Sequence, residues 1–141
     1  MEVFKEKELR EYGVIPKKIS RTIVKNTVLN YSEHYIKNHK YNHSFFSQLL
    51  NKKECDKVEE KINKAIELFV YSFTNDKEMK SILHFICIDD IRKLMDNHLV
   101  TITSMLHLDT NEVSHNRILK ELFLFRDYLL TKMIRNYKIV N

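Results

Sequence analysis

Three histidines, His34, His39 and His43, lie close together in the sequence and are the first side chains that could do chemistry. His39 and His43 are four residues apart, so they would share a face if this segment were helical. A zinc site needs three or four ligands that neighbouring hydrogen bonds hold in place, and nothing positions the nearest further candidate, Cys55, beside them. We therefore expect surface histidines in a polar turn, with no bound metal and no other cofactor.

Asp89 and Asp90 are adjacent carboxylates, but neighbours on a helix point about 100° apart and cannot act as a catalytic pair. Asp89 with Lys93 forms instead an i,i+4 pair typical of an exposed helix face. The sequence has no Gly-rich phosphate loop, no CxxC or HExxH motif, and no Ser-His-Asp or Cys-His set with supporting spacing. Cys55 and Cys87 lie in apolar helical patterns and are predicted to be buried free thiols. These patterns predict that the chain is not an enzyme.

The composition predicts an all-α domain that spans residues 1–141. Hydrophobic residues make up 43% of the chain and charged residues 30%, enough for a core and a solvated surface. One Gly and one Pro in 141 residues leave few of the turns that β-hairpins need. The net charge of +5 permits an acidic partner, nucleic acid or an anionic membrane surface without selecting one.

Apolar residues recur at helical spacing in segments separated by short polar breaks, which indicates seven or eight helices. The first expected helix is 2–12, and the second begins at Pro16 and frays within residues 34–43. The others are 44–50, 54–73, 79–95, 99–108 and 110–138, and the last of these is one helix or two. Thr74 to Asp76 supply N-cap residues for the helix that follows them, and Asn97 is a stop signal at its other end.

One segment has apolar residues on every side. Between Ile82 and Ile88 only His84 is polar. A helix that is apolar all round either spans a membrane or is surrounded by other helices. Seven residues cover only about 10 Å, against about 30 Å of bilayer hydrocarbon. We therefore expect a buried central helix at about 76–96.

Phe45, Phe46, Leu49 and Leu50 crowd a short predicted helix that can bury only one side. They are either ordinary core residues or part of a groove that binds a partner's helix, since a surplus of apolar residues on short amphipathic helices serves both structures. The pattern alone leaves both interpretations open.

The run from Val58 to Met95, "VEEKINKAIELFVYSFTNDKEMKSILHFICIDDIRKLM", resembles the fourth and fifth helices of poxviral Bcl-2-like cell-death inhibitors. The order of elements agrees: an Ile-rich amphipathic helix, a polar break, then a basic residue that opens an apolar helix ending in a basic patch. The segment "EHYIKNHKYNHSFFSQLL" is similar in layout, so the resemblance covers roughly residues 19–96. It implies a Bcl-2-like bundle of helices around the buried central helix.

The resemblance implies an inhibitor of apoptosis that sequesters BH3 helices of pro-apoptotic proteins such as Bax, Bak and Bim-like proteins in a hydrophobic groove. In cellular relatives the fifth helix opens with Asn-Trp-Gly-Arg, and that arginine pairs with an aspartate of the BH3 helix. Aligned on the apolar run, Lys80 takes the place of the arginine and Met79 that of the glycine, with His84 one turn further on. The groove residues implied are Phe45, Phe46, Leu49, Leu50, Val58, Ile62, Ile66, Met79, Lys80 and Leu83.

Two other functions stay open. A second branch of the family narrows its groove, dimerises and suppresses innate immune signalling toward NF-κB. A basic helical nucleic-acid binder would use segments such as "KYNH" and "RNYK". No known nucleic-acid-binding motif is present in the sequence, so we do not expect a nucleic acid as a partner. The resemblance implies a place in the host cytoplasm, or at the mitochondrial outer membrane if a hydrophobic anchor follows Asn141.

Overall fold

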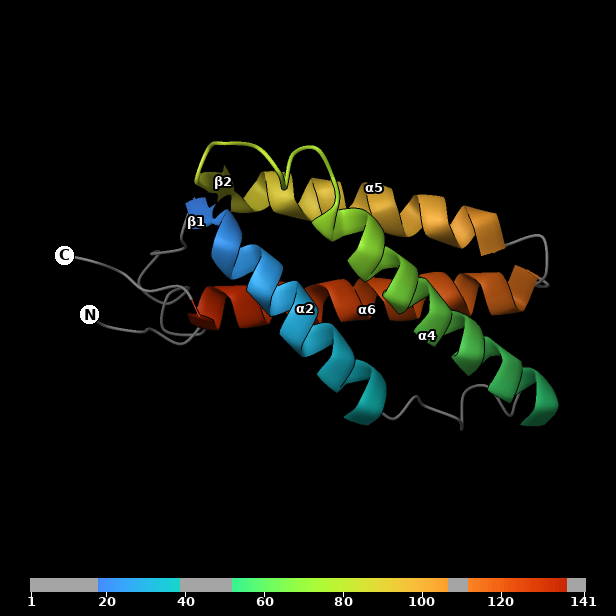
Figure 1. Cartoon of the computed structure of the whole chain (residues 1–141). Coiled ribbons are helices and arrows are strands. Elements are labelled where there is room, and N and C mark those ends of the chain that lie inside the picture. Colours follow the sequence, from blue (N-terminus) through green and yellow to red (C-terminus); the bar gives the residue numbers. More distant parts are fainter. Residues whose placement is uncertain (1–17, 39–51, 107–111, 137–141) are drawn as a thin grey trace.

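The computed structural model of the chain describes residues 18–38, 52–106 and 112–136, and four helices dominate this part. The all-α class is therefore confirmed, with one small addition, a two-stranded sheet. In Figure 1, α5 and α6 run side by side, and α2 and α4 form a second pair in which α4 crosses both of them and α2 crosses α6. The elements are β1 Lys18–Ser20, α2 Arg21–Asn38, α4 Lys52–Thr74, β2 Phe85–Cys87, α5 Ile88–Leu106 and α6 Glu112–Asn136.

The core lies between the two pairs of helices, and each helix contributes one stripe of apolar residues spaced three or four apart. The stripe of α4 is the one that periodicity predicts for residues 54–73, and its members are almost completely inaccessible to solvent. At the centre Phe69 lies 5.2 Å from Phe73 and 5.7 Å from Phe125, measured between ring centroids. The largest fully buried side chains are Phe69, Phe73, Phe125, Ile19, Ile62, Ile66, Met79, Ile91, Met95, Leu99 and Ile118.

The two strands tie the start of α2 to the start of α5. They pair antiparallel, with Ile19 opposite Ile86, and both of these side chains are buried. The flanking residue Phe85 is exposed, so β2 shows the period of two that a strand on a core surface requires.

The prediction of a buried helix at about 76–96 is wrong for the first half of that range. Residues 75–84 form turns, β2 occupies Phe85–Cys87, and α5 begins only at Ile88. In the run Ile82–Ile88, the side chains of Ile82, Leu83 and Phe85 lie at the surface, whereas Ile86 and Ile88 are buried in the core. In a helix the backbone carbonyl groups would accept hydrogen bonds from the helix's own N–H groups. Instead, the carbonyls of Glu78, Leu83 and Phe85 accept from the buried guanidinium of Arg21.

The other boundaries differ in smaller ways. Helix α5 continues through Asn97 to Leu106, because Met95, Leu99 and Ile102 keep one buried stripe across the expected stop. The last apolar region is a single helix, α6. The helices expected at 2–12 and 44–50 lie outside the described residues. None of the helices in the described ranges is long and apolar enough to cross a membrane.

Candidate functional site

The most unusual surface of the described structure is the connection from α4 to β2, residues 75–84, which we call the strap. Figure 1 shows it as two successive loops that lead from the end of α4 to β2 beside β1. The polar break at Thr74 and Asn75 ends α4 instead of starting a helix. Thr74 Oγ1 donates to the carbonyl of Val70 at 2.6 Å, and Asn75 Nδ2 donates to that of Tyr71 at 2.8 Å. Both side chains thus bond back to carbonyls of the preceding turn, and the backbone N–H of Asn75 also donates to the carbonyl of Tyr71 at 3.2 Å.

Arg21, the first residue of α2, holds the strap from inside. Its side chain is buried, and its Nε donates to the carbonyl of Glu78 at 2.8 Å. Its Nη1 donates to the carbonyls of Leu83 at 2.6 Å and Phe85 at 2.5 Å. The backbone N–H of Arg21 donates to the carbonyl of His84 at 2.9 Å. A buried guanidinium needs such partners to offset its loss of water, and the backbone of the strap and of Phe85 in β2 supplies them.

A second attachment joins the strap to α5. Nε2 of His98 lies 2.6 Å from Oδ2 of Asp76, and both side chains are about one-fifth exposed. The other carboxylate oxygen of Asp76 accepts from the backbone N–H of Glu78 at 2.8 Å, which shapes the first turn of the strap. The ring of Phe73 meets that of His98 edge-on, with the centroids 6.1 Å apart.

Large apolar side chains project from this anchored backbone into solvent. Ile82 is 93% exposed, Leu83 66% and Phe85 57%, and Lys80 beside them is also exposed. Burying such side chains stabilises a fold, so a row of them left outside a well-packed core is typical of an interaction surface. The strap therefore presents apolar contacts on a backbone that Arg21 has already ordered.

A cleft of about 540 Å³ lies beneath Leu83 and Phe85, between the strap, the sheet and the start of α5. Lys18 and Lys93 share it with Glu78 and Asp90, so the cleft has charges of both signs and is not a basic tract. Cys87 lines it as a free thiol that is only partly buried, which corrects the prediction that this thiol is buried. The side chain of Cys55 lies outside the described part. The full lining is Lys18, Arg21, Glu78, Leu83, Phe85, Ile86, Cys87, Asp90, Lys93, Leu94 and Asn97.

The lining of this cleft offers apolar contacts and charges of both signs to a ligand. In the ranges that the structure describes, no group of three or more His, Cys, Asp or Glu side chains could hold a metal ion. Asp89, expected to pair with Lys93, lies 3.9 Å from Arg92 instead, at the outer face of α5. The apolar side chains and the mixed charges suit a peptide segment that carries both apolar and charged residues.

Six of the ten predicted groove residues lie in the part of the chain that the structure describes. Val58, Ile62, Ile66 and Met79 are at most 2% exposed and pack in the core, which favours the core interpretation for these four. Lys80 and Leu83 lie on the surface of the strap, as does His84. The remaining four, Phe45, Phe46, Leu49 and Leu50, lie outside the described residues.

Arg21 was not predicted from the sequence, although a signal for it exists. It lies in register with the buried residues Val24, Val28 and Tyr35, spaced three, four and seven residues along α2. A charged residue on an apolar stripe must find buried partners, and that requirement marks it as structurally important.

No family model, curated protein or solved structure matches this chain.

Proposed function

We propose that the chain is a non-catalytic binding protein that captures an amphipathic helix of the BH3 class and so inhibits apoptosis. The observation that carries the proposal is that Ile82 and Leu83 on the strap, with Phe85 at the start of β2, are exposed on a backbone fixed by Arg21. The class of ligand comes from the resemblance of residues 58–95 to poxviral Bcl-2-like inhibitors. Host pro-apoptotic proteins would be the partners.

The proposed contact differs from the groove of that family. The ligand helix would place apolar anchors, spaced three, four and seven residues apart, against Leu83 and Phe85 above the cleft. Its acidic residue would meet Lys80 on the strap or Lys93 at the cleft wall. Because the strap is already ordered, binding would not have to order its backbone, which favours affinity.

A complete Bcl-2-like bundle of seven or eight helices belongs to the same proposal. Since the structure describes four helices, such a bundle would require three or four more in residues 1–17 and 39–51, with α5, Ile88–Leu106, in place of the expected helix at 76–96. The strap proposal does not depend on this, because its surface is formed entirely by described residues.

Calorimetric titration of the full chain with a panel of BH3 peptides tests the proposal. We expect at least one peptide to bind with a dissociation constant below about 50 µM. Leu83→Glu should weaken that binding at least about tenfold by placing a charge among the ligand's apolar anchors. Absence of binding by every peptide would overturn the choice of ligand.

Matched variants locate the contact. Leu29 on α2 is also an exposed leucine, at 50%, so Leu29→Glu should leave the affinity unchanged. Lys80→Glu should weaken binding if Lys80 meets the ligand's acidic residue, and an unchanged affinity would remove that residue from the contact. Equal loss from Leu29→Glu and Leu83→Glu would show that the strap is not the binding surface.

A further inference from the structure

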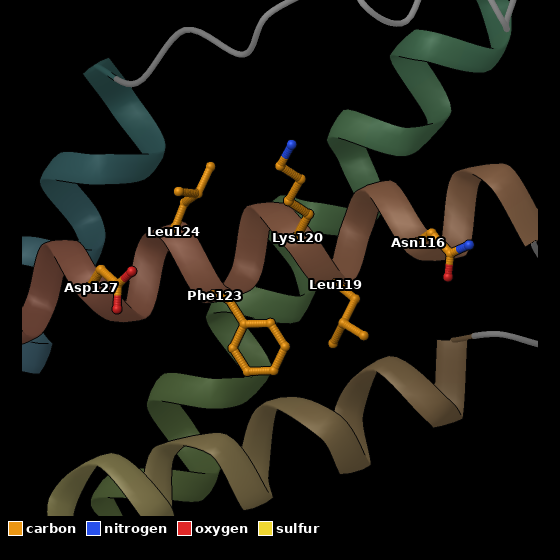
Figure 2. A pocket seen from close by; sticks show the side chains of 6 residues that line it. All are labelled: Asn116, Leu119, Lys120, Phe123, Leu124 and Asp127. Atoms are coloured by element: carbon orange, nitrogen blue, oxygen red, sulfur yellow. The ribbon is translucent and has the colours of Figure 1, made fainter. Parts of the chain in front are cut away.

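The outward face of α6 carries a shallow hollow of about 350 Å³, far from the strap in sequence. In Figure 2, Leu119 and Phe123 point to the side of α5 and form one edge, while Lys120 and Leu124 form the other. Asn116 and Asp127 lie at its two ends. Leu124 is 48% exposed, so the hollow offers apolar surface that the described fold does not cover.

One edge of the hollow is held in place by α5. The guanidinium of Arg126 lies 4.9 Å from the ring centroid of Phe123, and its Nη1 donates to Asp96 Oδ1 at 2.7 Å. The same guanidinium bonds Asp127 Oδ1 through Nη2 at 2.9 Å and through Nε at 3.1 Å. The surface is therefore already formed before any partner arrives.

The charges at this face are unbalanced at two points. One guanidinium, Arg126, serves two carboxylates, Asp96 and Asp127, so a negative charge is in excess near Asp127. Lys120 is exposed and makes no ion pair with any residue in the described ranges. The hollow thus has an unmatched positive charge on one side of its centre and an excess negative charge on the other.

We propose that this face binds a second copy of the chain, as a twofold-symmetric pair of antiparallel α6 helices. Lys120 and Asp127 are seven residues apart, which places them two turns apart on one side of the helix, with Phe123 and Leu124 midway between them. A twofold axis at that midpoint brings Lys120 of each copy to the partner's Asp127. Both unmatched charges are then paired, and each pairing occurs twice.

The shape of the hollow suits the same arrangement. Its two edges are rows of residues spaced four apart, and such rows interdigitate when two helices cross at about −50°. Because only part of one helix meets its copy, the interface is small and its ion pairs lie at the rim. We expect a weak dimer, with a dissociation constant of about 1–100 µM at low salt.

Charge reversal tests this proposal by sedimentation of the full chain at several concentrations. Lys120→Glu and Asp127→Lys should each weaken self-association at least about tenfold, because each creates two like-charge contacts. An equimolar mixture of the two variants should associate again, since each variant offers the charge that the other lacks. No other occupant of the hollow predicts this recovery.

Matched controls separate the dimer from other effects. Lys64→Glu makes the same charge change on the exposed side of α4 and should not alter sedimentation. Leu83→Glu on the strap should not alter it either, so this proposal and the proposed function fail independently. Helix content and melting temperature show that each variant is folded. A chain that sediments as a monomer up to about 200 µM, or a mixture that does not associate again, would overturn the dimer.

Discussion

The side chain of Arg21 hydrogen-bonds the backbone of Leu83, with its Nη1 2.6 Å from the carbonyl oxygen. The same nitrogen reaches the carbonyl of Phe85, and Nε reaches that of Glu78. One buried side chain at the start of α2 therefore determines the path of a surface segment distant in the sequence. The exposed row on the strap depends on this contact for its shape.

Arg21→Met should lower the free energy of unfolding by about 2–4 kcal/mol, because two carbonyls of the strap and that of Phe85 in β2 lose a charged donor. Arg21→Lys should retain part of the stability, since one ammonium group cannot reproduce the planar fork of donors. Urea unfolding of each variant measures these differences. Arg92→Met, at an exposed arginine of α5, is the control and should change stability by no more than about 0.5 kcal/mol. Equal effects at the two positions would show that Arg21 does not hold the strap.

The contact between Asp76 and His98 should contribute about 1 kcal/mol of coupling to stability. Asp76→Ala removes the carboxylate, and His98→Phe removes the hydrogen bond while keeping a ring against Phe73. A double-mutant cycle with thermal or urea unfolding isolates the interaction from the separate effects of each change. Additive losses would mean that the strap does not gain stability from this pair.

The long amphipathic helices were predictable because a single physical rule determines them. The residues Val58, Ile62, Ile66 and Phe69 recur at three- and four-residue spacing, and all of them are buried in α4. Such a pattern extends over several turns, so a single residue that disfavours a helix does not end the helix. Asn97 shows this, because α5 passes through it when the stripe on either side continues.

The strap and β2 were not predictable in the same way. A short apolar run such as Ile82–Ile88 is compatible with a buried helix or with a strand, and periodicity alone does not distinguish them. Two distant partners decide the outcome: Ile19 pairs with Ile86, and Arg21 takes the carbonyls of the strap. Contacts across so long a stretch of sequence leave no local pattern, and the candidate site was missed for the same reason.

Phe69 should be among the most costly residues to truncate, because it joins α4 to α6 at the centre of the core. It is fully buried between Phe73 and Phe125. Phe69→Ala should lower the free energy of unfolding by about 3–5 kcal/mol, from lost burial and from the cavity left behind. Tyr71→Ala, at a side chain 72% exposed on the same helix, should cost no more than about 0.5 kcal/mol. Equal losses of stability for Phe69→Ala and Tyr71→Ala in urea unfolding would show that Phe69 is not at the centre of the core.

Tyr128 should make the fold sensitive to alkaline pH. Burial disfavours its charged form and the nearby Tyr31 adds repulsion, so the pKa of Tyr128 is raised above its ordinary value of 10.0. Its contribution to stability is complete below the ordinary pKa and is lost as pH rises through the raised pKa, because the unfolded chain releases the proton first. In urea unfolding between pH 8 and about pH 11, Tyr128→Phe should therefore lose stability less steeply than the native chain. The difference should be small because the side chain is only half-buried. Tyr71→Phe, at an exposed tyrosine, is the control, and its stability should change with pH as that of the native chain does. If the stability of Tyr128→Phe also changes as that of the native chain does, the phenol of Tyr128 does not contribute to the pH dependence.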